Sequence, residues 1–130
     1  MYLLDTNILI YSLKGVAEVR ANLERHKTDA LGVSVLTLME LYYGAHKSRW
    51  VESNLAKVRS IEASFEVFAL SSECVETFGL LKARLEADGT FLDDFDLAIA
   101  ATTLAHNLVL VSNNTRHFER IPGLRLENWV

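Results

Sequence analysis

Short apolar runs alternate with longer amphipathic segments along this chain, and this alternation is the feature that most limits its possible folds. Four runs have the length and composition of strands: 2–4, 30–35, 65–70 and 108–111. Each of the first three runs is followed by a segment with helical spacing of its apolar residues. Such an order implies right-handed crossovers and a sheet covered on both faces. We therefore expect an α/β protein, a three-layer α/β/α sandwich with a mostly parallel central sheet.

The remaining segments of the chain carry apolar residues at the spacing of a helix. They span 8–13, 16–27, 37–47, 50–63, 72–87 and 93–105. Ser71 or Ser72 is suited to cap the fifth of these helices. Pro122 and Gly123 precede a last edge strand, expected at 124–126.

The length of the chain, 130 residues, suits a single domain over 1–130. Half of the residues are apolar and only one is proline, which favours a well-packed domain over disorder. Asp5 interrupts the apolar N-terminus after four residues, which argues against a secretory signal. No apolar run approaches the roughly 20 residues that a membrane helix needs. We therefore expect a soluble, cytoplasmic protein without a membrane span.

The cysteine count and the net charge exclude some kinds of site. Cys74 is the only cysteine, so an internal disulfide and a thiolate-based structural metal site are ruled out. The four histidines form no zinc-protease pair, and we expect them in structural or surface roles. The formal net charge of −4 argues against nucleic-acid binding through bulk electrostatics. The negative charge does not exclude a nuclease, because acids gathered in one metal site account for much of it.

Polar side chains follow three of the expected strands. Asp5 comes directly after the first, Glu40 lies just past the second, and Asn113 and Asn114 follow the fourth. Ligands of parallel α/β sheets bind at the carboxyl ends of the strands. We therefore expect these side chains to converge at one edge of the sheet.

Two of these acids also have simpler explanations. Asp5 stands at a strand-to-helix junction, where an aspartate often caps the following helix. Thr37 and Glu40 match a capping box, in which the glutamate reaches back to the amide of the cap residue. The sequence leaves a capping role and a site role open for both acids.

A third group of acids opens the alanine-rich helix that we expect to be buried. Asp93, Asp94 and Asp96 exceed what a helix start requires, although first-turn acids are favoured by the helix dipole. Asp93 and Asp96 share a face of the helix, whereas Asp94 and Asp96 face different directions. Of the three, Asp96 is the one that we expect in a site.

If Asp5, Glu40 and Asp96 meet, their like charges raise one another's pKa unless a cation neutralises them. Ligands that are all oxygen suit Mg²⁺ or Mn²⁺. Such an ion lowers the pKa of its water, which then attacks phosphorus. The acids therefore indicate phosphodiester hydrolysis.

Four ordered segments carry a family resemblance: LLDTNILI, SVLTLMELYYG, FDLAIAATTLAHNLVLVSNN and HFERIPGLRLENW. Together they resemble the PIN domain, and specifically its VapC-type toxins, from the first strand to the last residues. The resemblance implies a fold like the one expected above and an Mg²⁺- or Mn²⁺-dependent endoribonuclease that hydrolyses RNA. It also implies a homodimer and silencing by a cognate VapB-type antitoxin.

The resemblance assigns roles to individual positions. Four residues match the family's catalytic positions: Asp5, Glu40, Asp96 and Asn114. The three acids among them are the implied metal ligands. Thr6 and Ser112 match hydroxyl-bearing positions that line the pocket.

One position departs from the family pattern. Asn114 stands where many PIN domains have an aspartate, and an amide carries no charge. A second metal site is therefore in doubt, with Asp94 as a secondary candidate for the missing charge. We expect one well-held metal in the absence of RNA.

Three other functions compete with this one. A phosphatase of the haloacid-dehalogenase kind needs a second aspartate two residues after the first, and that position is Asn7. A catalytically idle PIN module that only binds RNA or protein is expected to have lost its acids. A PIN nuclease that matures RNA without an antitoxin differs in its gene neighbourhood.

Overall fold

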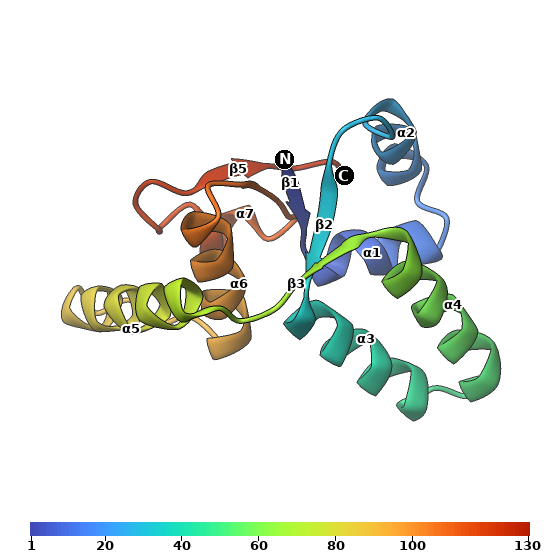
Figure 1. Ribbon diagram of the computed structural model, residues 1–130, viewed down its shortest axis with the longest axis horizontal. Coiled ribbons are helices and arrows are strands. Elements are labelled where there is room, and N and C mark those ends of the chain that lie inside the picture. Colours follow the sequence, from blue (N-terminus) through green and yellow to red (C-terminus); the bar gives the residue numbers. More distant parts are fainter.

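The computed structural model describes residues 1–130 and contains a five-stranded sheet (Figure 1). The strands are β1 (Tyr2–Leu4), β2 (Leu31–Ser34), β3 (Glu66–Phe68), β4 (Val109–Val111) and β5 (Arg125–Glu127). Their order across the sheet is β3-β2-β1-β4-β5, and every neighbouring pair is parallel. The expected parallel α/β architecture is therefore confirmed.

Seven helices connect the strands. They are α1 (Thr6–Leu13), α2 (Ala17–Arg25), α3 (Val35–Lys47), α4 (Val51–Ser64), α5 (Ser72–Ala87), α6 (Asp94–Ala105) and α7 (Thr115–Phe118). The short α7 was not predicted from the sequence. No helix is long and apolar enough to cross a membrane.

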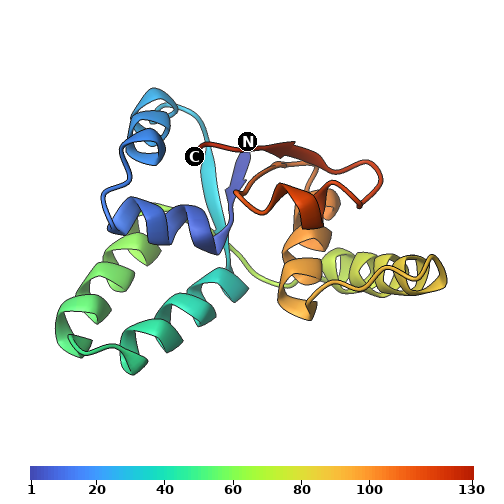
Figure 2. The ribbon, with the colours of Figure 1, turned by 180° about the vertical axis from the view of Figure 1, so that it is seen from behind.

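The two faces of the sheet pack against different groups of helices. Helices α1 to α4 lie on one side of the sheet, and α5 to α7 lie on the other (Figures 1 and 2). Successive side chains of a strand point to opposite faces, so Leu4 packs with Ile8 and Leu41 while Leu3 packs with Ile99 and Phe118. All six residues are buried. This arrangement gives the three layers that the alternation predicted.

The three central strands end at the same level. Leu4 of β1 pairs with Val33 of β2 on one side and with Val111 of β4 on the other. A polar residue follows each of these three positions: Asp5 after Leu4, Ser34 after Val33 and Ser112 after Val111. The carboxyl edge of the sheet therefore gathers polar side chains, as the sequence predicted.

The start of α3 corrects the prediction of a capping box. The helix begins at Val35, two residues earlier than expected, because Ser34 Oγ accepts the Leu36 N–H at 3.1 Å and caps it. Thr37 therefore lies inside the first turn and is fully buried. The side chain of Glu40 is consequently free of a capping role.

Candidate active site

Asp5 is buried at the end of β1 and holds two hydrogen bonds. Its Oδ1 accepts the Thr6 N–H at 2.8 Å, and its Oδ2 accepts the Ser112 hydroxyl at 2.7 Å. Burial raises the pKa of Asp5, while the bonds from Ser112 and Thr6 oppose that rise. Asp5 is thus both the cap of α1 and a carboxylate at the carboxyl edge of the sheet.

Glu40 approaches Asp5 through a shared neighbour. Thr6 Oγ1 donates to Glu40 Oε1 at 2.7 Å. Thr6 Oγ1 also lies 3.1 Å from Thr37 Oγ1. Partial burial raises the pKa of Glu40, and the negative charges of Asp5 and Asp93 raise it further, while the Thr6 bond opposes the rise. The hydroxyl of Thr6 therefore links the start of α1 to the first turns of α3.

Asp96, in the first turn of α6, is crowded by the other acids. Its pKa is raised to about 6, first by burial and then by the negative charges of Asp5, Asp93 and Glu40. His117 opposes the rise, with its Nδ1 at 4.0 Å from Asp96 Oδ2. The side chain of Asp96 is about a quarter exposed, at 26%, and forms no hydrogen bond. The three predicted acids thus act on one another electrostatically.

The neighbours of Asp96 divide between the site and the surface. Asp93 caps α6 by accepting the Phe95 N–H at 3.1 Å, and its charge acts on both Glu40 and Asp96. Asp94 instead forms an exposed ion pair with Lys82 Nζ at 3.0 Å. The side chain of Asp94 thus contacts α5, and its place as a secondary candidate in the pocket stays a prediction. Asp93 is the acid that the sequence analysis passed over.

Three residues after β4 complete this edge of the sheet. The Asn114 N–H donates to Ser112 Oγ at 2.9 Å, and the Asn114 carboxamide Nδ2 lies 2.8 Å from His117 Nδ1. Asn113 points elsewhere, because its side chain binds Tyr11 Oη at 3.3 Å. From the sequence, His117 was expected only in a structural or surface role. It lies three residues after Asn114, however, which is the spacing of neighbours on one helical turn.

The side chains do not form a ready-made metal-ligand group. No three histidine, cysteine or acidic residues lie close enough together for that. The expectation that Asp5, Glu40 and Asp96 lie within reach of one shared ion is therefore not met by these positions. The chemistry of the donors nevertheless fits a hard divalent cation, because all are oxygens and their mutual repulsion calls for positive charge.

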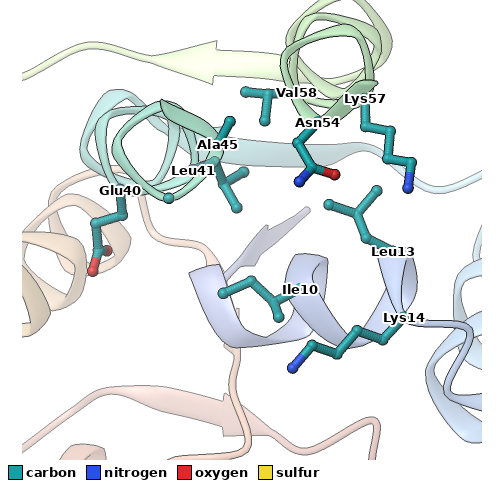
Figure 3. A pocket seen from close by; sticks show the side chains of 10 residues that line it. Ile10, Leu13, Lys14, Glu40, Leu41, Ala45, Asn54, Lys57 and Val58 are labelled. Carbon is teal, nitrogen blue, oxygen red and sulfur yellow. The ribbon is translucent and has the colours of Figure 1, made fainter. Parts of the chain in front are cut away.

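A groove of about 320 Å³ between α1, α3 and α4 adjoins the acids at Glu40 (Figure 3). Its lining is half apolar, with Ile10 and Leu41 facing each other across it. Lys14, at the end of α1, and Lys57, in the middle of α4, also line the groove. The groove thus carries positive charge beside a negatively charged edge.

Known sequences similar to this chain are ribonucleases. The family model for the PIN domain matches residues 2–124. Ribonuclease VapC2 of Haemophilus influenzae is 38% identical over 99% of this chain and 98% of its own length. A tRNA(fMet)-specific endonuclease VapC of Salmonella typhimurium is 38% identical over 98% of this chain and 97% of its own length.

Solved structures agree over the same extent. The crystal structure of VapBC2 from Rickettsia felis bound to a DNA fragment from their promoter contains a chain that matches with a TM-score of 0.93 and 37% identity. The match covers 99% of this chain and 98% of that one. The structure of DNA-bound VapBC from Salmonella typhimurium gives the same TM-score, identity and coverage.

Proposed function

The chain belongs to the PIN-domain family and to its VapC ribonucleases, and we propose that its Asp5, Asp96 and Glu40 hold a Mg²⁺ or Mn²⁺ ion for RNA cleavage. The observation that carries this proposal is the raised pKa of Asp96, about 6, to which two other acids of the set contribute by their charge. Three carboxylates from three different elements are costly to keep ionised together without a cation. Binding of the ion would require these side chains to move closer together than they stand here.

Each residue contributes a separate part of the chemistry. When bound, a divalent ion supplies a Lewis acid that withdraws charge from the phosphate and acidifies nearby water. Asp5 is held by Thr6 and Ser112 and therefore offers its oxygens in a fixed orientation. Glu40 is held by Thr6 through Oε1, which leaves its Oε2 free to help bind the ion or to orient the attacking water.

The partner that we propose is a VapB-type antitoxin. The similar chains of Rickettsia felis and Salmonella typhimurium are found in VapBC complexes. The acids of this chain carry charge that no cation of the protein neutralises closely, since His117 at 4.0 Å is the nearest to Asp96. An arginine of the antitoxin that enters this edge would displace the metal and stop cleavage. RNA cleavage undiminished in the complex would contradict this mode of inhibition.

A homodimer is part of the same proposal. An almost wholly apolar depression between α3, α5 and α6 is lined by Leu36, Leu70, Val75, Phe78 and Phe95. Leu70 and Val75 are exposed in the single chain. A second copy would cover this surface, and a Val75→Glu variant that sediments as a monomer while the wild type is dimeric would support the assignment.

The central experiment measures RNA cleavage against metal concentration. Single-turnover rates are compared for the wild type, Asp5→Asn and Asp96→Asn, with Asp94→Asn as a matched control on the same helix. The tRNA(fMet) named for the Salmonella relative is the first substrate to test. We expect the two site variants to lose cleavage and the control to keep it. Wild-type rates in either site variant at saturating Mn²⁺ would overturn the mechanism.

Two further results separate the alternatives. Metal-dependent cleavage rules out an idle module, and growth arrest that the product of a neighbouring gene relieves rules out an RNA-maturation nuclease. Asn114→Asp adds a charge beside the site and is expected to tighten a second metal.

A further inference from the structure

His117 stands between two residues of the proposed site without belonging to it. Its Nδ1 lies 2.8 Å from Asn114 Nδ2 and 4.0 Å from Asp96 Oδ2. It is carried by α7, a single helical turn that is anchored by the fully buried Phe118. The imidazole is therefore held in place although its side chain is about half exposed, at 51%.

The two ends of the Asn114 carboxamide differ in what they attract. The NH₂ group only donates hydrogen bonds, whereas Oδ1 only accepts them and can bind a cation. With Nδ2 bound to an unprotonated His117 Nδ1, the free end of the amide is Oδ1, which accepts no bond within the protein. If Nδ1 carried the proton, the amide would turn over and present its NH₂ group, which repels a cation.

The backbone of Asn114 is fixed from the other side. Its N–H donates to Ser112 Oγ at 2.9 Å, and Ser112 in turn donates to Asp5 Oδ2 at 2.7 Å. One continuous series of contacts therefore runs from Asp5 through Ser112, Asn114 and His117 to Asp96. In this series, only the contact with His117 determines which end of the Asn114 carboxamide is free.

We propose that His117 is a positioning residue, whose Nδ1 holds the Asn114 carboxamide so that Oδ1, and not the NH₂ group, is presented at the acidic edge. This role rests on the proposed function, because an oriented oxygen matters only if a cation or its water binds there. Compared with an aspartate at this position, Asn114 then lacks the negative charge but still presents an oriented oxygen as a ligand.

The orientation itself is tested by NMR. Long-range ¹H–¹⁵N correlation spectra of the wild type, at mildly alkaline pH, report which imidazole nitrogen of His117 is protonated. We expect Nε2 to carry the proton and Nδ1 to be the acceptor. A proton on Nδ1 would overturn the proposal, because the amide would then have to present its NH₂ group.

The consequence for the site is tested by Mn²⁺ titration without RNA. His117→Phe keeps a ring but has no acceptor, and is expected to weaken Mn²⁺ binding by about 10–100-fold, as loss of an outer hydrogen-bond partner does. His117→Asn places an acceptor at the position of Nδ1 and should restore binding to within about threefold of the wild type. Glu119→Ala, at the exposed end of the same helix, is the control and should bind as the wild type does.

The outcomes separate this inference from the function on which it rests. If the wild type binds Mn²⁺ and His117→Phe binds it equally well, the positioning role is wrong and the metal mechanism stands. If His117→Phe and His117→Asn are equally weak, the nitrogen acceptor is irrelevant and the positioning role is also wrong. If the wild type binds no Mn²⁺ and cleaves RNA without it, both proposals fall. Thermal melting of each variant confirms that the fold is retained.

Discussion

The two halves of the acidic edge are held in different ways. At the strand half, Asp5 is 4% exposed and has a hydrogen bond to each carboxylate oxygen. At the helix half, Asp96 is partly exposed and has no hydrogen bond, and its pKa is set by burial and by neighbouring charge. The scaffold therefore determines the geometry of one carboxylate and only the electrostatic surroundings of the other.

The difference follows from where each acid sits. Asp5 continues the central strand of the sheet, whose neighbours β2 and β4 fix it on both sides. Asp96 opens a helix, where the dipole favours a negative charge without specifying its exact direction. In the proposed metal site, Asp5 would be a rigid ligand and Asp96 one that is free to adjust to the ion and the substrate.

The largest effect is expected from lengthening each acid by one methylene. Asp5→Glu displaces a carboxylate that has no freedom to compensate, so cleavage should fall by about 100-fold or more. Asp96→Glu should cost only about 10-fold, because this side chain can adjust. Single-turnover rates at saturating Mn²⁺ measure both, and equal losses would remove the distinction between the two halves.

A smaller effect is expected from releasing Asp5. Ser112→Ala removes the hydroxyl that donates to Asp5 Oδ2 at 2.7 Å. Metal affinity should fall by about 10–100-fold, and Asp5 should come to resemble Asp96. Calorimetric Mn²⁺ titration provides the measurement, and an unchanged affinity would show that the sheet alone positions Asp5.

Asp96, in the helix half, should make the stability of the protein depend on pH. The pKa of Asp96 is raised from 3.8 to about 6, so between these values the folded, metal-free protein binds more protons than the unfolded chain. Stability should therefore fall as pH rises through this window. Asp96→Asn removes this part of the fall, which amounts to about 1–2 kcal/mol once partial exposure is allowed for.

Urea unfolding in EDTA at pH values on both sides of the window measures this effect. Asp5 and Glu40 also have raised pKa values, so a smaller slope should remain in Asp96→Asn. A slope identical to that of the wild type would mean that Asp96 is not crowded in the folded protein.

The smallest effect is expected outside the site. Asp94 forms an exposed ion pair with Lys82, and pairs of this kind contribute little to stability. Asp94→Asn should leave both the urea midpoint and the Mn²⁺ affinity unchanged. A marked loss of metal affinity would place Asp94 in the site despite its ion pair with Lys82.

The strand half was also the more predictable from sequence. Asp5 ends an apolar run, and parallel strands bring their carboxyl ends together, so its location follows from the period of the pattern alone. Glu40 was ambiguous, because Thr37 and Glu40 fit a capping box unless the helix begins earlier. The start of α3 at Val35 decides the question, and it depends on one serine that caps in place of a threonine.

The helix half was less predictable because its contacts depend on how helices pack against one another, and not on the regular alignment of parallel strands. The choice of Asp96 over Asp94 followed from helical geometry, but the influence of Asp93 on Glu40 depends on how α3 and α6 pack. The helix α7 is too short to show a helical period, so no sequence pattern indicated that His117 lies near Asp96. These relations come from tertiary packing, which no local pattern encodes.

The hydrogen bond between Ser112 and Asp5 spans 107 residues, and this separation has a consequence for the protein during its synthesis. Asp5 is made first, and Ser112, which directly follows the neighbouring strand β4, is made 107 residues later. At ordinary rates of translation the interval is roughly 5–20 s. During that time a nascent chain possesses its first acid and none of the later side chains that fix it. A cell that makes this nuclease is therefore exposed to an assembled cleavage site only after the chain has been synthesised past Ser112.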